Sequence, residues 1–155
     1  MAMQDILFEF LHHEIVSYLK SKPNKEEEDV SELEYMGFAC GFRIVERLTK
    51  DWPRFKEELD ILKFLCTDFW SSIYQRQVDN LRTNHQGMYV LCDNDFRLLT
   101  KISDGNQYLE YAPLYVTFTC GLIRGALANL GITCIVHSEV HSMPACRFNI
   151  QVQKS

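Results

Sequence analysis

The sequence lacks the features that would place it in a membrane or on a nucleic-acid duplex. No apolar run reaches the roughly 18 residues that a membrane span requires. The opening residues 1–14 carry acids where a signal peptide needs cations. Sixteen basic against 21 acidic residues give a net charge of -5, whereas a duplex-binding domain needs a basic face. These absences predict a cytoplasmic protein that binds no nucleic acid.

The sequence also lacks short motifs that carry chemistry. It has neither the glycine-rich phosphate-binding patterns nor the G-x-S-x-G elbow of a serine nucleophile. No C-x-x-C pair is present among six cysteines that have apolar neighbours. We therefore expect reduced, mostly buried cysteines, no metal site and no cofactor. They are Cys40, Cys66, Cys92, Cys120, Cys134 and Cys146.

What the chain does have is enough apolar material for one core. At 155 residues and 46% hydrophobic composition, it has the size and composition of one globular domain. A chain of this length buries about two thirds of its unfolded surface without help from disulfides or metal. We expect a single domain over residues 1–155.

Apolar periodicity predicts four helices. The first covers residues 5–20, and its apolar arc is too wide for a single neighbour. An acidic, flexible loop is expected over 21–30, before a capping box, Ser31-x-x-Glu34, that starts the second helix. The third helix opens at Pro53 and is broken by residues 82–87, and the fourth, apolar nearly all round, covers 109–130.

Four β-rich runs complete the pattern. Residues 88–92 and 96–102 form one expected hairpin around an acidic turn, and 132–140 and 146–152 form another around Met143 and Pro144. The last run alternates apolar and polar residues, as in a sheet with one dry face. The predicted class is α+β, four helices packed on a four-stranded antiparallel sheet, in the order ααα-ββ-α-ββ.

Two glycine pairs lie on the helices. Gly37 and Gly41 are one turn apart on the second helix, and Gly121 and Gly125 have the same spacing on the fourth. Glycine inside a helix costs about 1 kcal/mol relative to alanine, so each pair indicates close approach of another backbone. For Gly37 and Gly41, a helix crossing within the chain and contact with a partner subunit are both open.

Every candidate for chemistry has a structural alternative that we favour. His12, His13 and Glu14 are neighbours on a helix and indicate a solvated face. His137 and His141 are about 13 Å apart on a strand. Cys120 lies inside the buried helix and is expected to pack there, and Arg124 is expected to pair with a carboxylate.

Several motifs together resemble the small-subunit family of the transport protein particle, TRAPP. They are Met36-Gly37-Phe38 with Gly41, residues 55–60 (FKEELD), 79–87 (DNLRTNHQG), 121–127 (GLIRGAL) and 143–146 (MPAC). The run from Leu81 to Gly87 is typical of the subunit 6 branch, closer to its B form than to its A form. The resemblance covers nearly the whole chain and implies the same α+β fold.

The resemblance also implies a function. Such subunits pair with a related small subunit through their first two helices, in a particle that tethers vesicles and exchanges nucleotide on Rab-type GTPases. It implies a peripheral position at cis-Golgi and endoplasmic reticulum membranes, other TRAPP subunits as partners, and a Rab reached indirectly. The exchange surface is attributed to other subunits, so we expect a non-catalytic scaffold. The expected interface residues are Leu7, Phe10, Leu11, Met36, Gly37, Cys40, Gly41 and Ile44.

One position departs from the related partner subunit, which carries an acylated cysteine just before its third helix. Here the corresponding residue is Trp52, followed by Pro53, so the lipid function is not carried over. A module that holds an acyl chain or another small apolar ligand remains the alternative to the interaction subunit.

Overall fold

The computed structural model describes residues 3–21, 26–100 and 112–153. The helices and strands follow one another in the predicted order, except that the third helix is divided into segments and one short helix, α5, is added. The elements are α1 (Met3–Ser21), α2 (Glu26–Leu48), α3 (Glu58–Phe64), η1 (Leu65–Phe69), α4 (Trp70–Tyr74), β1 (Asn80–Thr83), β2 (Met88–Asp93), α5 (Arg97–Thr100), α6 (Ala112–Asn129), β3 (Cys134–Glu139) and β4 (Cys146–Val152).

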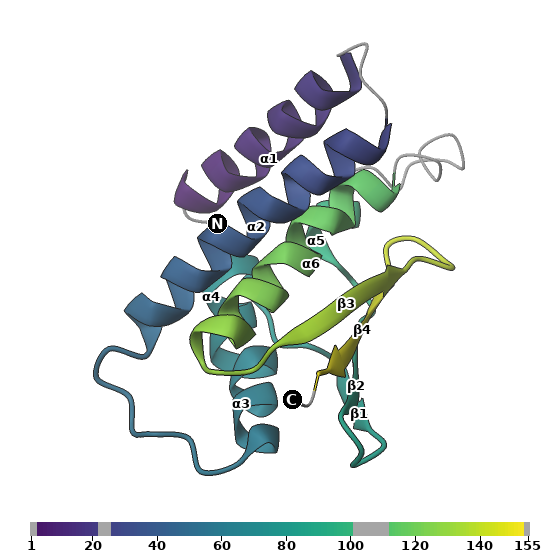
Figure 1. Cartoon of the computed structure of the whole chain (residues 1–155). Coiled ribbons are helices and arrows are strands. Elements are labelled where there is room, and N and C mark those ends of the chain that lie inside the picture. The colour runs from purple at the N-terminus through teal and green to yellow at the C-terminus, as the bar shows by residue number, and fades with distance from the viewer. Residues whose placement is uncertain (1–2, 22–25, 101–111, 154–155) are drawn as a thin grey trace.

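The four strands form one antiparallel sheet in the order β1-β2-β4-β3. Alternate residues of β4, Cys146, Phe148 and Ile150, are buried against the helices. Figure 1 shows the helices gathered on one side of the sheet, with α6 nearest to β3. The predicted α+β class, helices on an antiparallel sheet, is confirmed.

The first hairpin is displaced from its predicted position. β2 pairs with β1, which precedes it, instead of with residues 96–102. The turn is set by Asn84, whose side-chain oxygen accepts hydrogen bonds from the backbone amides of Gln86 and Met88 at 2.7 and 3.1 Å, and by Gly87 at φ 90°. Phe96 is fully buried and is followed by the short helix α5; residues 101 and 102 lie outside the described range.

The helix boundaries also differ from the expectation. α2 begins at Glu26, so Ser31 lies inside the helix and the part of the expected loop from residue 26 is helical. The third helix begins at Glu58 instead of Pro53, widens into one π-helical turn, η1, and ends where Gln75 adopts φ 60°. The helix therefore ends well before the predicted break at residues 82–87, because this left-handed residue stops it and leaves room for β1.

The two glycine pairs meet each other inside the chain. A Cβ on Gly37 would lie 2.0 Å from the carbonyl oxygen of Phe118, and one on Gly41 would lie 2.1 Å from that of Leu122. Seen from α6, Gly121 and Gly125 abut the carbonyl oxygens of Glu34 and Phe38 at 2.1 Å. The helices α2 and α6 thus cross backbone to backbone, which only glycine permits.

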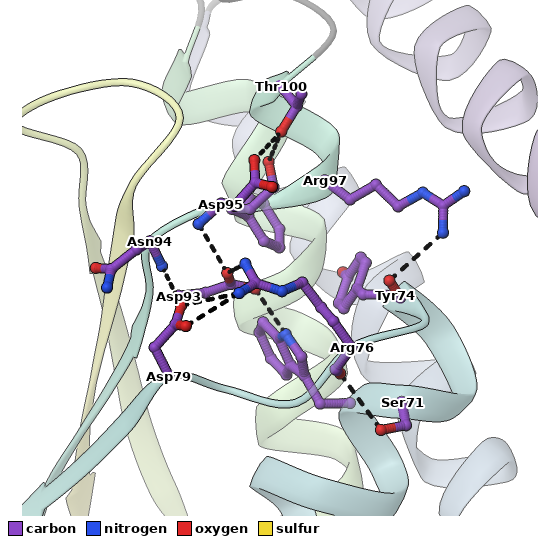
Figure 2. A network of polar contacts seen from close by, with 11 residues as sticks. Ser71, Tyr74, Arg76, Asp79, Asp93, Asn94, Asp95, Arg97 and Thr100 are labelled. Carbon is purple, nitrogen blue, oxygen red and sulfur yellow. Dashed lines mark hydrogen bonds and ion pairs between the residues drawn. The ribbon is translucent and has the colours of Figure 1, made fainter.

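A buried carboxylate joins the sheet to the third helix. Asp93, at the end of β2, accepts a hydrogen bond from the indole nitrogen of Trp70 at 2.8 Å and pairs with Arg76. Arg76 also binds Asp79 at 3.0 Å, and Asp79 accepts the backbone N–H of Asn94 (Figure 2). Burial raises the pKa of Asp93, although these donors oppose the rise. The network fixes the chain direction into α5.

Candidate interaction face

The inner side of α1 holds it to the rest of the molecule. Val16 and Leu19 are buried, and the ring of Phe8 lies 6.4 Å from that of Tyr74 and 6.3 Å from that of Phe118. Glu9 pairs with Arg97 at the start of α5. Arg97 also points at the carbonyl oxygen of Tyr74 (Figure 2). It is the first residue of α5 and follows the turn after Asp93.

His12 is part of this inner side, which corrects the expectation of a solvated face. The His12 ring is buried 5.5 Å from the ring of Phe118 and 5.8 Å from that of Tyr115. Burial, followed by the neighbouring charge of His13, lowers the pKa of His12 to about 4. His13 and Glu14 are exposed as expected, and the Nδ1 atom of His13 lies 2.9 Å from the hydroxyl of Tyr115.

The outer side of α1 is apolar and exposed. Leu7, Phe10, Leu11 and Tyr18 are each 61% exposed. Sequence periodicity anticipated an arc too wide for one neighbour, and the helix has apolar side chains on both sides. Monomers rarely leave such a group of large side chains in water, so this side of α1 agrees with the apolar arc expected from the sequence.

α2 adds a smaller exposed group on one side of its glycines. Met36 and Cys40 are exposed, and Ile44 is partly buried against the core. Both α1 and α2 pack on α6, on the side away from the sheet (Figure 1). We call Leu7, Phe10, Leu11, Met36, Cys40 and Ile44 the α1/α2 face.

Gly37 and Gly41 do not belong to the α1/α2 face. Both are buried against the backbone of α6, so a partner subunit cannot reach them. Of the two alternatives that the sequence left open, the crossing within the chain is the one observed. The other six residues of the expected interface stay a prediction, since no partner chain is present.

The remaining candidates for chemistry have structural roles. Arg124 pairs with Glu34 at 2.9 Å and lies 4.5 Å above the ring of Phe38, as predicted for a structural ion pair. Cys120 is buried in α6, and burial raises its pKa to about 12. Five of the six cysteines are buried and Cys40 is exposed, which confirms mostly buried thiols.

Acidic, histidine and cysteine side chains do not converge on a metal-sized site within the described residues. His141, which follows β3, lies 3.5 Å from the carboxylate of Glu139. No helix in the described ranges is long and apolar enough to cross a membrane.

Trp52, which precedes α3, is a partly packed aromatic residue. Trp52 is 45% exposed, and its ring lies 5.1 Å from that of Phe64, which also contacts Phe55 at 5.2 Å. A hollow of about 420 Å³ beside Trp52 has polar residues, Arg54 and Asn129 among them, in its lining. Deeper in the helix layer, Phe69, Trp70 and Phe118 are buried.

Comparisons with known proteins agree over nearly the whole chain. The sequence model of the family described as "Transport protein particle (TRAPP) component" matches residues 8–153. The chain is 58% identical over 153 residues to trafficking protein particle complex subunit 6b of Danio rerio, and 57% over 154 residues to subunit 6B of Homo sapiens. Each alignment covers 97% of this chain and 98% of the relative.

Subunit 6A of Homo sapiens is 49% identical over 155 residues, with 97% of this chain and 98% of the relative covered. The higher identity to the 6B proteins confirms the expectation drawn from residues 81–87. Among solved structures, the chain is similar to a trafficking protein particle complex subunit 3 from Naegleria fowleri covalently bound to palmitic acid. The TM-score is 0.83 at 14% identity, and the match covers 98% of this chain and 96% of that one. At this identity the likeness supports the fold alone.

Proposed function

Because the chain belongs to the TRAPP component family, in its subunit 6 branch, we propose that it is a non-catalytic scaffold subunit of that vesicle-tethering particle. In this proposal it pairs with a related small subunit through α1 and α2. The particle acts as the exchange factor for a Rab-type GTPase in transport from the endoplasmic reticulum to the Golgi and within the Golgi. The chain itself reaches these membranes peripherally, through the complex.

One observation carries the proposal. Four large side chains on the outer side of α1 are exposed although the inner side of the same helix is well packed. Full burial of each such side chain contributes about 1.5–3 kcal/mol. A partner helix laid on the α1/α2 face would gain several kilocalories per mole, and a stable interface of about 800 Å² on each partner requires such anchors.

Native mass spectrometry tests the pairing. The full chain is measured alone and after co-expression with a related small TRAPP subunit, and a one-to-one complex is expected. Leu11→Lys places a charge in the centre of the α1/α2 face and should weaken the complex at least about 100-fold. Phe42→Lys is the matched control, because Phe42 is an exposed residue on the other side of the glycines of α2. Equal losses in the two variants would contradict the proposed interface.

The alternative, a module that binds an acyl chain, is tested in the same spectra. Trp52 at the equivalent position, the polar lining of the hollow beside it and the filled helix layer argue against it. A bound acyl chain would appear as added mass on the isolated chain. Such a species in stoichiometric amount would favour the ligand-binding alternative.

The scaffold role also predicts no intrinsic exchange activity. Nucleotide release from a GTPase requires contacts that disturb the phosphate and magnesium site, and no cluster on the α1/α2 face provides reactive or strongly charged groups for that task. In a fluorescent-nucleotide release assay with an early-secretory Rab, the isolated chain should match its heat-inactivated control. Acceleration in proportion to its concentration would overturn the scaffold role.

A further inference from the structure

A pocket lies between α1, α5 and α6. It has a volume of about 200 Å³ and is lined by four residues of α1, by Arg97 and Leu98 of α5 and by Tyr115 of α6. Two of the α1 residues differ sharply in exposure, because Phe10 is 61% exposed whereas His12 is 3% exposed. Leu98 and Tyr115 are buried as well. The pocket therefore has a buried end at His12 and a rim at Phe10, and we call it the His12 pocket.

The buried end holds a polar atom without a partner. The Nε2 atom of His12 is buried and has no hydrogen-bond partner among the residues that the structure describes. The ring is held in place by the rings of Phe118 and Tyr115, whose centroids lie 5.5 and 5.8 Å away. Because native proteins pair nearly all buried polar groups, this atom indicates that a hydrogen-bonding group enters the pocket from outside the chain.

The size of the pocket fits one aromatic ring. An apolar cavity of about 150 Å³ accommodates benzene, so about 200 Å³ has room for a ring with one small substituent. A serine or threonine side chain would leave most of this space empty. Phe10, Leu98 and Tyr115 contribute rings and aliphatic carbons to the lining, and such walls favour a ring over a cluster of water molecules.

The charges of the lining favour an uncharged occupant. Glu9 forms an ion pair with Arg97, so an ionised occupant would have to compete with that pair. His12 is neutral at pH 7, because its pKa is about 4, and it offers no charge to a carboxylate. A hydroxyl group both donates and accepts a hydrogen bond, so it pairs with Nε2 whichever ring nitrogen carries the proton, whereas an indole N–H only donates. An aromatic ring that bears a hydroxyl is the side chain of tyrosine.

The rim joins the pocket to the α1/α2 face, because Phe10 belongs to both. A partner on that face covers the rim, and tyrosine is one of the residues that most often anchor an interface by filling a pocket. We propose that the His12 pocket receives a tyrosine side chain of the subunit that covers the α1/α2 face, with the tyrosine hydroxyl hydrogen-bonded to Nε2 of His12. This inference rests on the proposed function for its partner and adds the group that anchors the partner.

Binding of p-cresol tests the pocket on the isolated full chain. This probe has the ring and the hydroxyl of a tyrosine side chain. It is added to protein labelled with ¹⁵N at histidine, and the imidazole signals are followed by nuclear magnetic resonance. We expect a saturable shift of the His12 signal and no shift of His137, which is exposed on β3. An unshifted His12 signal at about 5 mM p-cresol would overturn the proposal.

Toluene separates recognition of the hydroxyl from filling of an apolar space, because it has the ring of p-cresol without the hydroxyl. The ratio of the p-cresol affinity to the toluene affinity, measured by calorimetry, should fall at least about fivefold in His12→Phe. This variant keeps a ring but removes Nε2. His137→Phe is the matched control and should leave the ratio unchanged. An equal ratio in both variants and the wild type would contradict the hydrogen bond to His12.

A scan of the partner tests the source of the ring. Each tyrosine of the related small subunit is replaced in turn by phenylalanine, and the affinity for this chain is measured. One replacement should weaken the complex at least about fivefold with the wild-type chain and have no such effect with His12→Phe. If every replacement affects the wild type and the variant equally, the partner places no tyrosine in the pocket and the proposal is wrong.

Native mass spectrometry separates this outcome from a failure of the proposed pairing. Absence of any complex with the related small subunit would overturn the pairing and, with it, the partner's tyrosine. A complex that forms while p-cresol still shifts the His12 signal with undiminished affinity would leave the pairing intact and show that the partner does not fill the His12 pocket.

Discussion

The helices α1 and α6 are both rich in apolar residues, yet the chain uses them in opposite ways. α6 is buried nearly all round and meets α2 through four glycines with no side chain between the backbones. α1 places Glu9 and His12 among its buried residues and leaves four large apolar residues exposed. The apolar content of a helix therefore does not show which of its sides packs against the rest of the chain. The glycine pairs mark a helix crossing within the chain, whereas α1 packs through a side that includes Glu9 and His12 and keeps its large apolar residues exposed.

The largest effect is expected from a substitution that forces the α2/α6 crossing apart. Gly41→Leu puts a branched side chain where a Cβ would already lie 2.1 Å from the carbonyl oxygen of Leu122. Overpacking a core costs about 1–3 kcal/mol, and more where backbone must move, so we expect loss of the native fold instead of a selective loss of pairing. Circular dichroism measures the helical content that remains in the isolated variant, and thermal unfolding measures its stability.

Arg43→Leu is the matched control for this variant. It adds the same side chain at an exposed position two residues along α2 and should change the free energy of unfolding by no more than about 0.5 kcal/mol. A Gly41→Leu variant that unfolds like the wild type would show that α2 and α6 can separate without loss of stability. The glycine crossing would then not be what holds the two helices together.

The inner side of α1 should make the protein sensitive to acid. The pKa of His12 is about 4 in the folded chain against 6.5 as its ordinary value. Between these two pH values the unfolded chain binds more protons, so the free energy of unfolding falls as the pH falls from about 6.5 toward 4. At pH 5 the loss is roughly 2 kcal/mol relative to pH 7.

Denaturant unfolding at pH 7 and pH 5 measures this loss. His12→Phe keeps an aromatic ring at the position but removes the titrating group, so its pH dependence should be smaller by roughly 2 kcal/mol. His137→Phe is the control, because His137 is exposed on β3 and does not contribute to the pKa of His12. If the two variants respond to acid equally, His12 is not the group that couples α1 to pH.

Much of the fold follows from residue patterns, while the site follows only in part. The alternation in β4 and the continuous apolar run of α6 predict those elements, because burial on one face or on all sides leaves a direct trace in the sequence. The first hairpin is mispredicted because residues 96–100 have β-rich composition, and only the turn at Asn84 and Gly87 reveals the correct partner strand.

The inward direction of α1 could not be predicted from its hydrophobic arc. Glu9 is buried because it forms an ion pair with Arg97, which lies 88 residues later in the sequence. No local sequence pattern predicts such a long-range pair. The glycines gave the stronger signal. Two pairs with identical spacing on different helices are mutually complementary, and comparing them with each other would have favoured the crossing within the chain over the partner interface.

The smallest expected effect is a difference in thiol reactivity between the two helices α2 and α6, and its measurement requires no substitution. Cys40 is the exposed thiol among the six and lies in the α1/α2 face, whereas Cys120 is buried in α6, where burial raises its pKa to about 12. Because the thiolate is the reactive species, iodoacetamide at pH 7.5 should label Cys40 in the native chain and leave Cys120 unlabelled. Addition of the related small subunit should slow labelling of Cys40 at least about tenfold, since the partner covers it, and peptide mapping by mass spectrometry assigns the site. Labelling of Cys40 at an undiminished rate in the purified complex would place the partner elsewhere, even if α1 remained buried by it.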